Sequence, residues 1–341
     1  MARDQRRQAA IVYSRRAFVA AAGGLVVLPL GLLVAEAQET RIYRVGVLTQ
    51  DSPPAPGSKP GVLRMALQRL GYIEGRNIVF QIRGAEGENA RFPTLAAELV
   101  ALKPDVIVAD STPAAVAAKH ATTAIPVVIV NVSDPVGTGL VASLAHPGGN
   151  VTGGTDFGTE LAVRSVGLLH DLVPKLSRIA VLMSDNPVHP LQLKAIEDAS
   201  RNIRLTVLPI MVRTEADFEE AYASMVRQKA GALIWLGGSP VSTPAQRAKI
   251  IDLSAKAKLP TLWPTRRDVE AGGLMSNAAN YERKWETVAM YIDKILKGAK
   301  PADLPIEQPT KFELVINLKT AKALGLTIPQ SLLLRADEVV Q

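Results

Sequence analysis

Residues 105–113 read Asp-Val-Ile-Val-Ala-Asp-Ser-Thr-Pro, and this stretch carries the pattern on which the fold depends. The largely apolar run at 105–109 is typical of a strand buried on both faces, as in a parallel sheet covered by helices. The polar residues after it end the strand, and Ser111 or Thr112 can cap a helix whose first turn holds Pro113. The stretch therefore predicts a strand-to-helix unit of an α/β protein.

The same alternation extends along the chain in two series, followed by a tail. The first series has expected strands at 43–49, 77–83, 105–109, 126–132 and 151–155, and expected helices at 61–70, 90–102, 113–121 and 136–144. The second has expected strands at 178–183, 205–212, 232–236, 260–264 and 273–276, and expected helices at 159–172, 191–201, 215–229 and 244–258. The tail has a helix at 281–298 and a strand at 312–317. Strands that alternate with helices in this way predict right-handed crossovers and parallel sheets.

Two consecutive series favour two doubly wound parallel-sheet lobes joined by several crossover segments. A single TIM barrel is the alternative at this length. Because the tail departs from the alternating pattern, we expect the chain to cross between lobes more than once. The expected lobe 1 is 40–155 plus 281–305, and the expected lobe 2 is 156–280 plus 306–341.

The composition removes several classes of function. The 341 residues include no Cys, which excludes a disulfide scaffold, thiolate metal sites, a cysteine nucleophile and a lipoprotein anchor. The formal charge of +7 favours nucleic acid as a partner. Of this charge, +3 lies in residues 1–37, where five Arg oppose Asp4 and Glu36, and the other 304 residues carry +4. We therefore expect no nucleic-acid partner.

The N-terminus has the features of an export signal. Ser14-Arg15-Arg16-Ala17-Phe18 matches the twin-arginine pattern, an apolar run follows at 19–34, and Ala35-Glu36-Ala37 is a small-x-small cleavage site. The alternative is an uncleaved anchor, but the apolar run is shorter than the ~20 residues that span a bilayer. Residues 1–37 are therefore predicted to be a cleavable twin-arginine signal peptide, and the mature protein to be periplasmic.

Motifs of several enzyme classes are missing. The first expected strand is followed by Thr49-Gln50-Asp51-Ser52-Pro53 and not by a dinucleotide-binding glycine pattern, and no P-loop or nucleophile elbow is present. The four His lack metal-ligand spacing, and the lone His189 is expected at the surface. We expect no enzymatic activity, no catalytic residues, no metal and no cofactor.

Polar clusters follow the expected strands instead. The helix N-terminus at Ser111 and Thr112 either is a plain cap or binds an anion such as a carboxylate. Asp134 either caps the expected helix at 136–144 or pairs with a ligand ammonium group. Trp263 either packs in the core or stacks on a ligand. Because ligands bind at the carboxyl ends of parallel strands, these clusters predict a cleft that would suit an amino acid.

Four further motifs give the chain a family resemblance. They are Leu70–Asn77 (LGYIEGRN), Asp134–Val141 (DPVGTGLV), His146–Gly153 (HPGGNVTG) and Gln308–Asn317 (QPTKFELVIN). On these residues the chain resembles ABC-transporter substrate-binding proteins of the tryptophan/tyrosine-binding type, which have the type I periplasmic binding protein fold. The resemblance implies that a solute is held between two lobes, with contacts from Ser111, Thr112, Ser133 and Asp134 in lobe 1, Asn186, Ser239 and Thr265 in lobe 2, and Thr155 and Asp156 at the hinge.

The resemblance also implies a function and partners. We expect a monomeric periplasmic protein that captures a small polar solute, an amino acid or an analogue, by hinge closure. It would deliver the solute to an inner-membrane ABC permease with its ATPase. Two alternatives stay open, namely an exported α/β enzyme that acts on a small metabolite, and a ligand-sensing module of the same fold.

Overall fold

A computed structural model describes residues 41–52, 61–238 and 243–341. The predicted signal peptide at 1–37, the Pro-rich stretch at 53–60 and Ser239 lie outside the described residues. Residues 40–341 form one compact unit. No helix within the described ranges has both the length and the apolar character needed to cross a bilayer.

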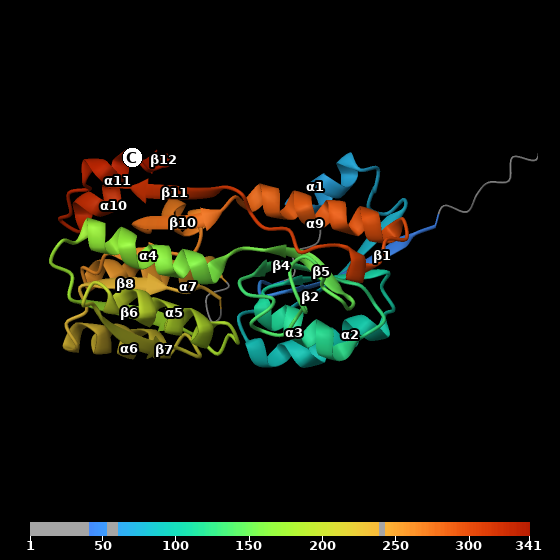
Figure 1. Cartoon of the computed structure of the whole chain (residues 1–341), viewed down its shortest axis with the longest axis horizontal. Helices are drawn as coiled ribbons and strands as arrows, with labels where there is room; N and C mark the ends of the chain where they lie inside the picture. Colours follow the sequence, from blue (N-terminus) through green and yellow to red (C-terminus); the bar gives the residue numbers. More distant parts are fainter. Residues whose placement is uncertain (1–40, 53–60, 239–242) are drawn as a thin grey trace, which may run out of the picture. The chain divides into compact units, whose positions relative to one another are not determined.

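The first sheet is parallel throughout and has helices on both faces (Figure 1). In spatial order its strands are β2 (Ile78–Gly84), β1 (Tyr43–Thr49), β3 (Val106–Asp110), β4 (Val127–Val132) and β5 (Val151–Thr155). Helices α2 (Phe92–Ala101) and α3 (Thr112–Ala121) pack on one face, against Ile107 and Ala109 of β3. Helices α1 (Val62–Arg69) and α9 (Tyr281–Leu296) pack on the other, against Val106 and Val108. The apolar residues 106–109 are therefore buried on both faces of the sheet, as their sequence predicts.

The second sheet contains seven strands. In spatial order they are β12 (Glu338–Val340), β11 (Phe312–Asn317), β10 (Met275–Ala279), β9 (Thr261–Trp263), β8 (Ala232–Trp235), β6 (Arg178–Met183) and β7 (Thr206–Met211). Only the β10–β11 pair is antiparallel among the described strands. The sequence predicts parallel pairing here. The difference arises because the chain leaves the sheet after β10, forms α9 against the first sheet, and re-enters the second sheet as β11.

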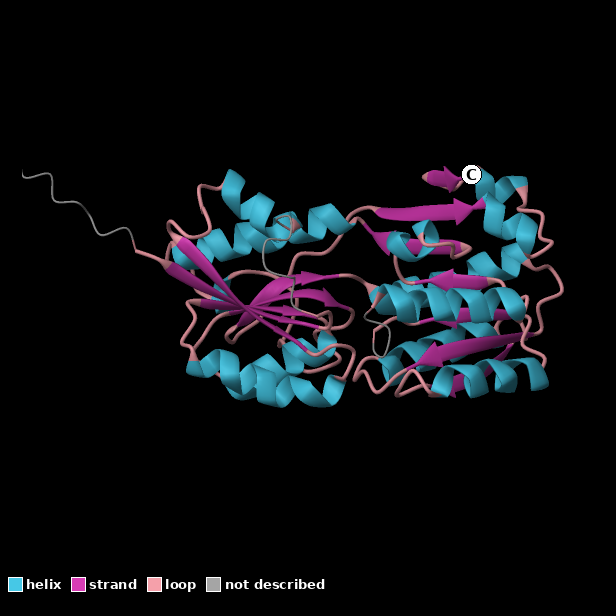
Figure 2. Ribbon diagram, turned by 180° about the vertical axis from the view of Figure 1, so that it is seen from behind, coloured by secondary structure: helices cyan, strands magenta, loops and turns pink. Residues whose placement is uncertain are grey.

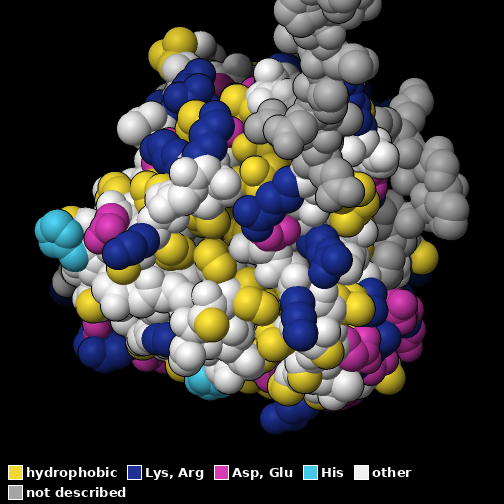
Figure 3. All heavy atoms as spheres, turned by 90° about the vertical axis from the view of Figure 1, so that its right-hand side faces the viewer, with side chains coloured by type: hydrophobic (Ala, Val, Ile, Leu, Met, Phe, Trp, Pro, Cys, Tyr) yellow, Lys and Arg dark blue, Asp and Glu magenta, His cyan; other side chains and the backbone are white. Residues whose placement is uncertain are grey.

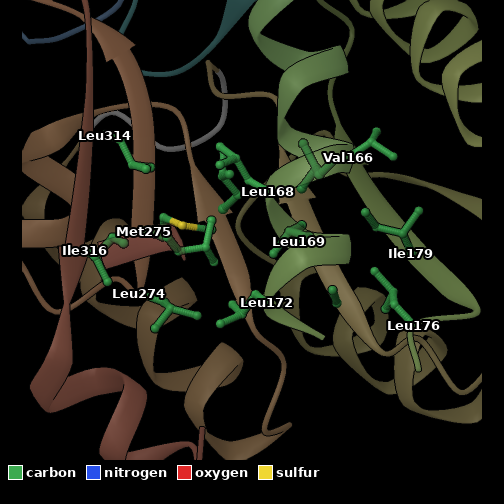
Figure 4. Packing of buried hydrophobic residues seen from close by; sticks show 14 of the residues in the cluster. Val166, Leu168, Leu169, Leu172, Leu176, Ile179, Leu274, Met275, Leu314 and Ile316 are labelled. Carbon is green, nitrogen blue, oxygen red and sulfur yellow. The ribbon is translucent and has the colours of Figure 1, made fainter. Parts of the chain in front are cut away.

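Helices cover both faces of the second sheet as well. On one face α4 (Gly158–Leu172) and α5 (His189–Arg201) pack, together with the short α10 (Leu318–Ala323) and α11 (Gln330–Leu333). On the other face lie α6 (Asp217–Arg227) and α7 (Pro244–Lys256). Figure 4 shows Leu168, Leu169 and Leu172 of α4 beside Met275 of β10 and the strand that carries Leu314. The α/β prediction with two doubly wound sheets is confirmed, and the TIM-barrel alternative is wrong.

The helix expected at 136–144 is absent, and an irregular turn takes its place. Asp134 Oδ1 accepts the Gly137 N–H at 2.7 Å, and the Leu140 and Val141 N–H groups both bond the carbonyl of Pro135. Gly139 has φ +70°, which lies outside the right-handed helical region. Two glycines in the first turn thus favour a compact loop over a continuing helix. The sequence does not predict four short elements, namely α8 (Arg266–Glu270), α10, α11 and β12.

Three stretches of the described chain run between the two sheets, and we call them the crossing segments (Figure 2). They are 154–157, which includes the last two residues of β5, 280 before α9, and 306–311 before β11. The first and third are joined, since the Thr155 N–H bonds the Glu307 carbonyl at 3.0 Å and the Glu307 N–H bonds the Gly153 carbonyl at 2.8 Å. The residue boundaries of the two lobes remain a prediction.

Figure 3 shows the face at the end where β1 begins, with Lys, Arg, Asp and Glu side chains interspersed among hydrophobic ones. Such mixing of both charge signs is typical of a solvated protein surface.

Candidate functional site

Backbone strain singles out one edge of the first sheet. Four non-glycine residues with positive φ follow helices, where the left-handed conformation is a usual way to end a helix: Lys103, Arg204, Lys229 and Lys258. Of the other four, Glu86 (φ 54°) lies in the turn after β2, and three have no such explanation. Ser111 (φ 122°), Asn131 (φ 55°) and Phe157 (φ 57°) lie at or just beyond the carboxyl ends of β3, β4 and β5. Strained backbone concentrates at binding sites, so this edge is the candidate site.

A carboxylate, an amide and an ammonium group form a chain at this edge. Asn131 donates from Nδ2 to Asp110 Oδ1 at 2.6 Å, and Lys284 on α9 donates from Nζ to Asn131 Oδ1 at 2.5 Å. Burial raises the pKa of Asp110 to about 6, although the Asn131 hydrogen bond opposes the rise. Burial lowers the pKa of Lys284, against the attraction of Asp156 and Asp110. Both charged groups are therefore held in an environment that disfavours their charges.

Basic side chains of the second sheet's layer face this edge. Burial raises the pKa of Asp51, which follows β1, while the positive charges of Arg267 and Arg247 act to lower it. The Arg267 guanidinium lies 5.4 Å from the centre of the Tyr281 ring at the start of α9. Arg247 also pairs with the buried Asp268 at 2.6 Å. Two arginines from α7 and α8 thus lie near groups of the first sheet's layer.

A cavity of about 80 Å³ lies between the carboxyl ends of the two sheets. Ser133, Asp156 and Lys284 line it from one side, and Gln192 and Asn277 from the other. Gln192 Oε1 and Asn277 Nδ2 are buried and have no hydrogen-bond partner within the described ranges. Because buried polar atoms are nearly always bonded, these two favour a polar occupant of the cavity.

Two of the predicted first-lobe contacts lie at the strained edge. Ser111 caps α3 by accepting the Ala114 N–H at 3.4 Å. The Oγ1 of the buried Thr112 has no partner among the described residues. Asp134 differs from these because its carboxylate is bonded within its own turn, and it lines none of the described cavities. The role of Asp134 in binding an ammonium group stays a prediction.

The predicted hinge and second-lobe contacts have varied surroundings. Thr155 is buried and donates from Oγ1 to the Val132 carbonyl at 2.8 Å. Asp156 accepts the Gly158 N–H at 2.9 Å and lines the cavity. Asn186 accepts the Val188 N–H at 3.2 Å. Thr265 is exposed and caps α8. These contacts with a solute remain predictions.

The surface position expected for His189 is wrong. Its ring is 1% exposed and its Nδ1 accepts the Ser184 N–H at 2.8 Å. Burial lowers its pKa to about 4, so the ring is neutral at pH 7. Trp263 packs edge to face against Trp235, with ring centres 5.5 Å apart, and both rings line the cavity.

Asp110, Asn131 and Lys284 were not among the predicted contacts. Asp110 carried a usable signal, since it is the first charged residue after an apolar run at 106–109. Asn131 falls within an expected strand, so it gives no signal of a site. Lys284 lies 153 residues further along the chain, so its contact with Asn131 is not visible as spacing. Within the described part of the chain no group of His, Asp and Glu side chains could hold a metal ion.

Comparisons with known proteins agree with the fold. The tyrosine-binding protein of Clostridioides difficile (strain R20291) is 28% identical over 278 residues, which cover 81% of this chain and 79% of that protein. A conserved domain protein from Vibrio cholerae O1 biovar eltor has a similar structure, with a TM-score of 0.79 and 28% identity over 88% of this chain and all of that one. An ABC domain from Streptococcus pneumonia in complex with L-Trp has a TM-score of 0.75 and 28% identity with the same coverage. The family model for ABC transporter substrate binding proteins matches residues 45–340. The chain therefore belongs to the ABC transporter substrate-binding protein family.

Proposed function

We propose that the protein binds a free aromatic amino acid between the carboxyl ends of its two sheets. The observation that carries this proposal is the chain of Asp110, Asn131 and Lys284 at the strained edge. A carboxylate at the end of β3 can take the solute ammonium group. The capped N-terminus of α3, with the free Oγ1 of Thr112, can take the solute carboxylate. An anionic group beside the hydrogen-bond donors of a helix N-terminus matches the two charged groups of a zwitterion.

Relatives support an aromatic side chain. One relative at 28% identity is named a tyrosine-binding protein, and a structure at 28% identity contains L-Trp. In this chain the rings of Trp235, Trp263 and Tyr281 lie around the candidate site. Aromatic pairs in edge-to-face contact can accept a further ring at their free faces.

Hinge closure accounts for capture of the solute. The lobes are proposed as 40–155 plus 281–305 and 156–280 plus 306–341, joined by the crossing segments. Asn89, before α2, donates from Nδ2 to Asp185 Oδ1, beyond β6, at 2.6 Å, so the layers of the two sheets also meet away from those segments. A solute that contacts both lobes stabilises the arrangement in which they are close.

The setting and partners complete the proposal. Residues 1–37 act as a twin-arginine signal, the mature protein is a periplasmic monomer, and it delivers the solute to an inner-membrane permease with its ATPase. The Arg15→Lys, Arg16→Lys double variant should remain in the cytoplasm, as judged by cell fractionation. Export of this variant at the normal rate would argue against the twin-arginine route.

We propose that the protein binds its solute without catalysing a reaction, although one contact resembles part of an enzyme active site. Ser184 Oγ lies 3.4 Å from His189 Nδ1, which is the spacing of a weak nucleophile–base pair. That nitrogen already accepts the Ser184 backbone N–H at 2.8 Å, so it is not free to take the hydroxyl proton. Turnover of a bound solute in a sustained incubation would favour the exported-enzyme alternative.

Thermal unfolding in the presence of single amino acids tests the proposal. Tryptophan or tyrosine should raise the midpoint, because a ligand that binds only the folded state stabilises it by mass action. The Asp110→Asn variant should bind about 10- to 100-fold more weakly, which corresponds to the loss of a hydrogen bond to a charged group. Asp134→Asn tests the other candidate partner of the ammonium group, and it should preserve the shift because the Asp134 carboxylate is bonded within its own turn. If Asp134→Asn abolishes the shift and Asp110→Asn preserves it, our assignment of the ammonium partner is wrong.

A further inference from the structure

A second cavity, of about 440 Å³, lies at the crossing segments. Residues of all three segments line it, among them Thr155, Asn280 and Glu307. Its size falls within the range of small-molecule sites. Lys284 is the one lining residue that it shares with the smaller cavity between the sheets, so the two spaces are adjacent but distinct.

The carboxylates of this cavity are already bonded to its walls. Glu313 Oε1 accepts from Asn280 Nδ2 at 2.8 Å. Glu307 Oε1 accepts from Thr287 Oγ1 at 3.3 Å. One oxygen of each carboxylate is therefore already occupied.

The cations of the cavity are less engaged. The exposed Arg283 guanidinium has no hydrogen-bond or ion-pair partner among the described residues. The exposed Lys311 has only a long ion pair, 3.9 Å from Asp337. Lys284 is held by Asn131. The cationic donors that remain available are therefore the Arg283 and Lys311 side chains, and both can bind an anion.

The position of the cavity connects it with hinge motion. Its walls are joined across the segments by the bonds of Thr155 and Gly153 to Glu307 and by the bond of Asn280 to Glu313. A lobe rotation must change backbone torsions in these segments, and φ of Phe157 is already 57° there. An occupant that touches all three segments binds one lobe arrangement better than another.

We propose that this cavity is a second ligand site, which binds a small organic or inorganic anion and thereby alters the affinity for the solute. Arg283 and Lys311 provide the charge, and carboxylate and phosphate groups are the chemistry they recognise. By linkage, an anion that favours one lobe arrangement changes the solute Kd, and the solute changes the anion Kd by the same factor.

Titration calorimetry of the full chain with citrate, succinate and inorganic phosphate tests the site. At least one of these should bind saturably at one per chain, and the comparison between them separates carboxylate from phosphate recognition. Arg283→Gln with Lys311→Gln should weaken that binding at least tenfold. Lys319→Gln with Lys322→Gln, which removes two exposed positive charges from α10, is the matched control and should change it less than twofold. No saturable binding of any probe, or equal loss in both double variants, would overturn the site.

Solute binding supplies the second measurement. With no anion present, the Arg283→Gln, Lys311→Gln variant should bind tryptophan within twofold of the native chain, and saturating anion should change the native Kd about fivefold or more. An unchanged Kd would refute the coupling. Competitive displacement of the anion by tryptophan would place both in one site and overturn the proposal. If tryptophan does not bind at all, the proposed solute is wrong, but the anion titration still tests whether this cavity binds an anion.

Discussion

The Asp110→Asn substitution should stabilise the unliganded protein while it weakens solute binding. The pKa of Asp110 is raised from 3.8 to about 6, with burial as the largest cause. The folded state therefore binds more protons than the unfolded state between these pH values, and the contribution of Asp110 to stability falls as pH rises through that window. A shift of about 2 pH units corresponds to about 3 kcal/mol at pH 7.5. The neutral Asn removes this penalty, and its amide oxygen can still accept from Asn131.

Urea unfolding at several pH values is the assay. The difference in unfolding free energy between Asp110→Asn and the native chain should be about 3 kcal/mol at pH 7.5 and should shrink toward zero near pH 4. Asp303→Asn, at an exposed aspartate in the 3₁₀ turn at Pro301–Asp303, is the control and should change stability by less than about 0.5 kcal/mol. A destabilised Asp110→Asn protein at pH 7.5, or a difference that does not vary with pH, would refute the reasoning.

Three further substitutions probe other parts of the structure. Gly153→Ala should lower stability by more than about 2 kcal/mol in urea unfolding, because φ is +128° and a Cβ there would lie 2.4 Å from the Ile129 carbonyl oxygen. A variant with near-native stability would contradict this backbone geometry. His189→Asn should make the protein less sensitive to acid. Burial lowers the His189 pKa from 6.5 to about 4, so the native protein loses about 3 kcal/mol of stability as pH falls through that range. An unchanged pH profile of unfolding would speak against a neutral buried ring. Arg247→Met should destabilise the protein by about 3–5 kcal/mol, because it leaves the carboxylate of Asp268, which is 1% exposed, without its cation. A loss below about 1 kcal/mol in the same assay would show that Arg247 and Asp268 do not form a buried salt bridge.

The strand and helix order was predictable because the local signals agree with the tertiary structure. The strand at 43–49 and that at 178–183 match β1 and β6 residue for residue. Each is an apolar run between turn residues, and each is buried in its sheet, so propensity and burial favour the same outcome. The predicted helix at 136–144 failed for the opposite reason. Its apolar spacing is helical, but the two glycines and the Asp134 cap favour a closed turn. A prediction from apolar periodicity alone does not take these residues into account.

The candidate site was predictable only in part, because its main contacts join distant positions. The sequence directs attention to Ser111 and Thr112, since a cap after a buried strand is a local pattern. It gives no indication that Lys284 reaches Asn131, a contact between α9 and β4 across 153 residues. The antiparallel return of β11 is equally non-local, because it depends on α9 packing against the first sheet. Contacts of this kind follow from topology and are not visible as spacing.

The arrangement of Asp110 and Lys284 itself argues for binding rather than stability. Within the described residues neither group lies within 4.0 Å of an opposite charge, and the Asn131 amide is interposed between them. A site selected for stability would bring two such buried charges into direct contact, since an unpaired buried charge is strongly unfavourable. The interposed amide instead fixes the position of each group and leaves part of its hydrogen-bonding capacity open. Asn131 adopts φ 55° to do so, which adds local strain to the unfavourable burial of both charges. In the proposed complex, the opposite charges of a zwitterion would pair with these groups and remove the unfavourable free energy of their burial. On this reasoning the Asn131→Ala variant should lose solute affinity even though Asn131 itself need not touch the solute.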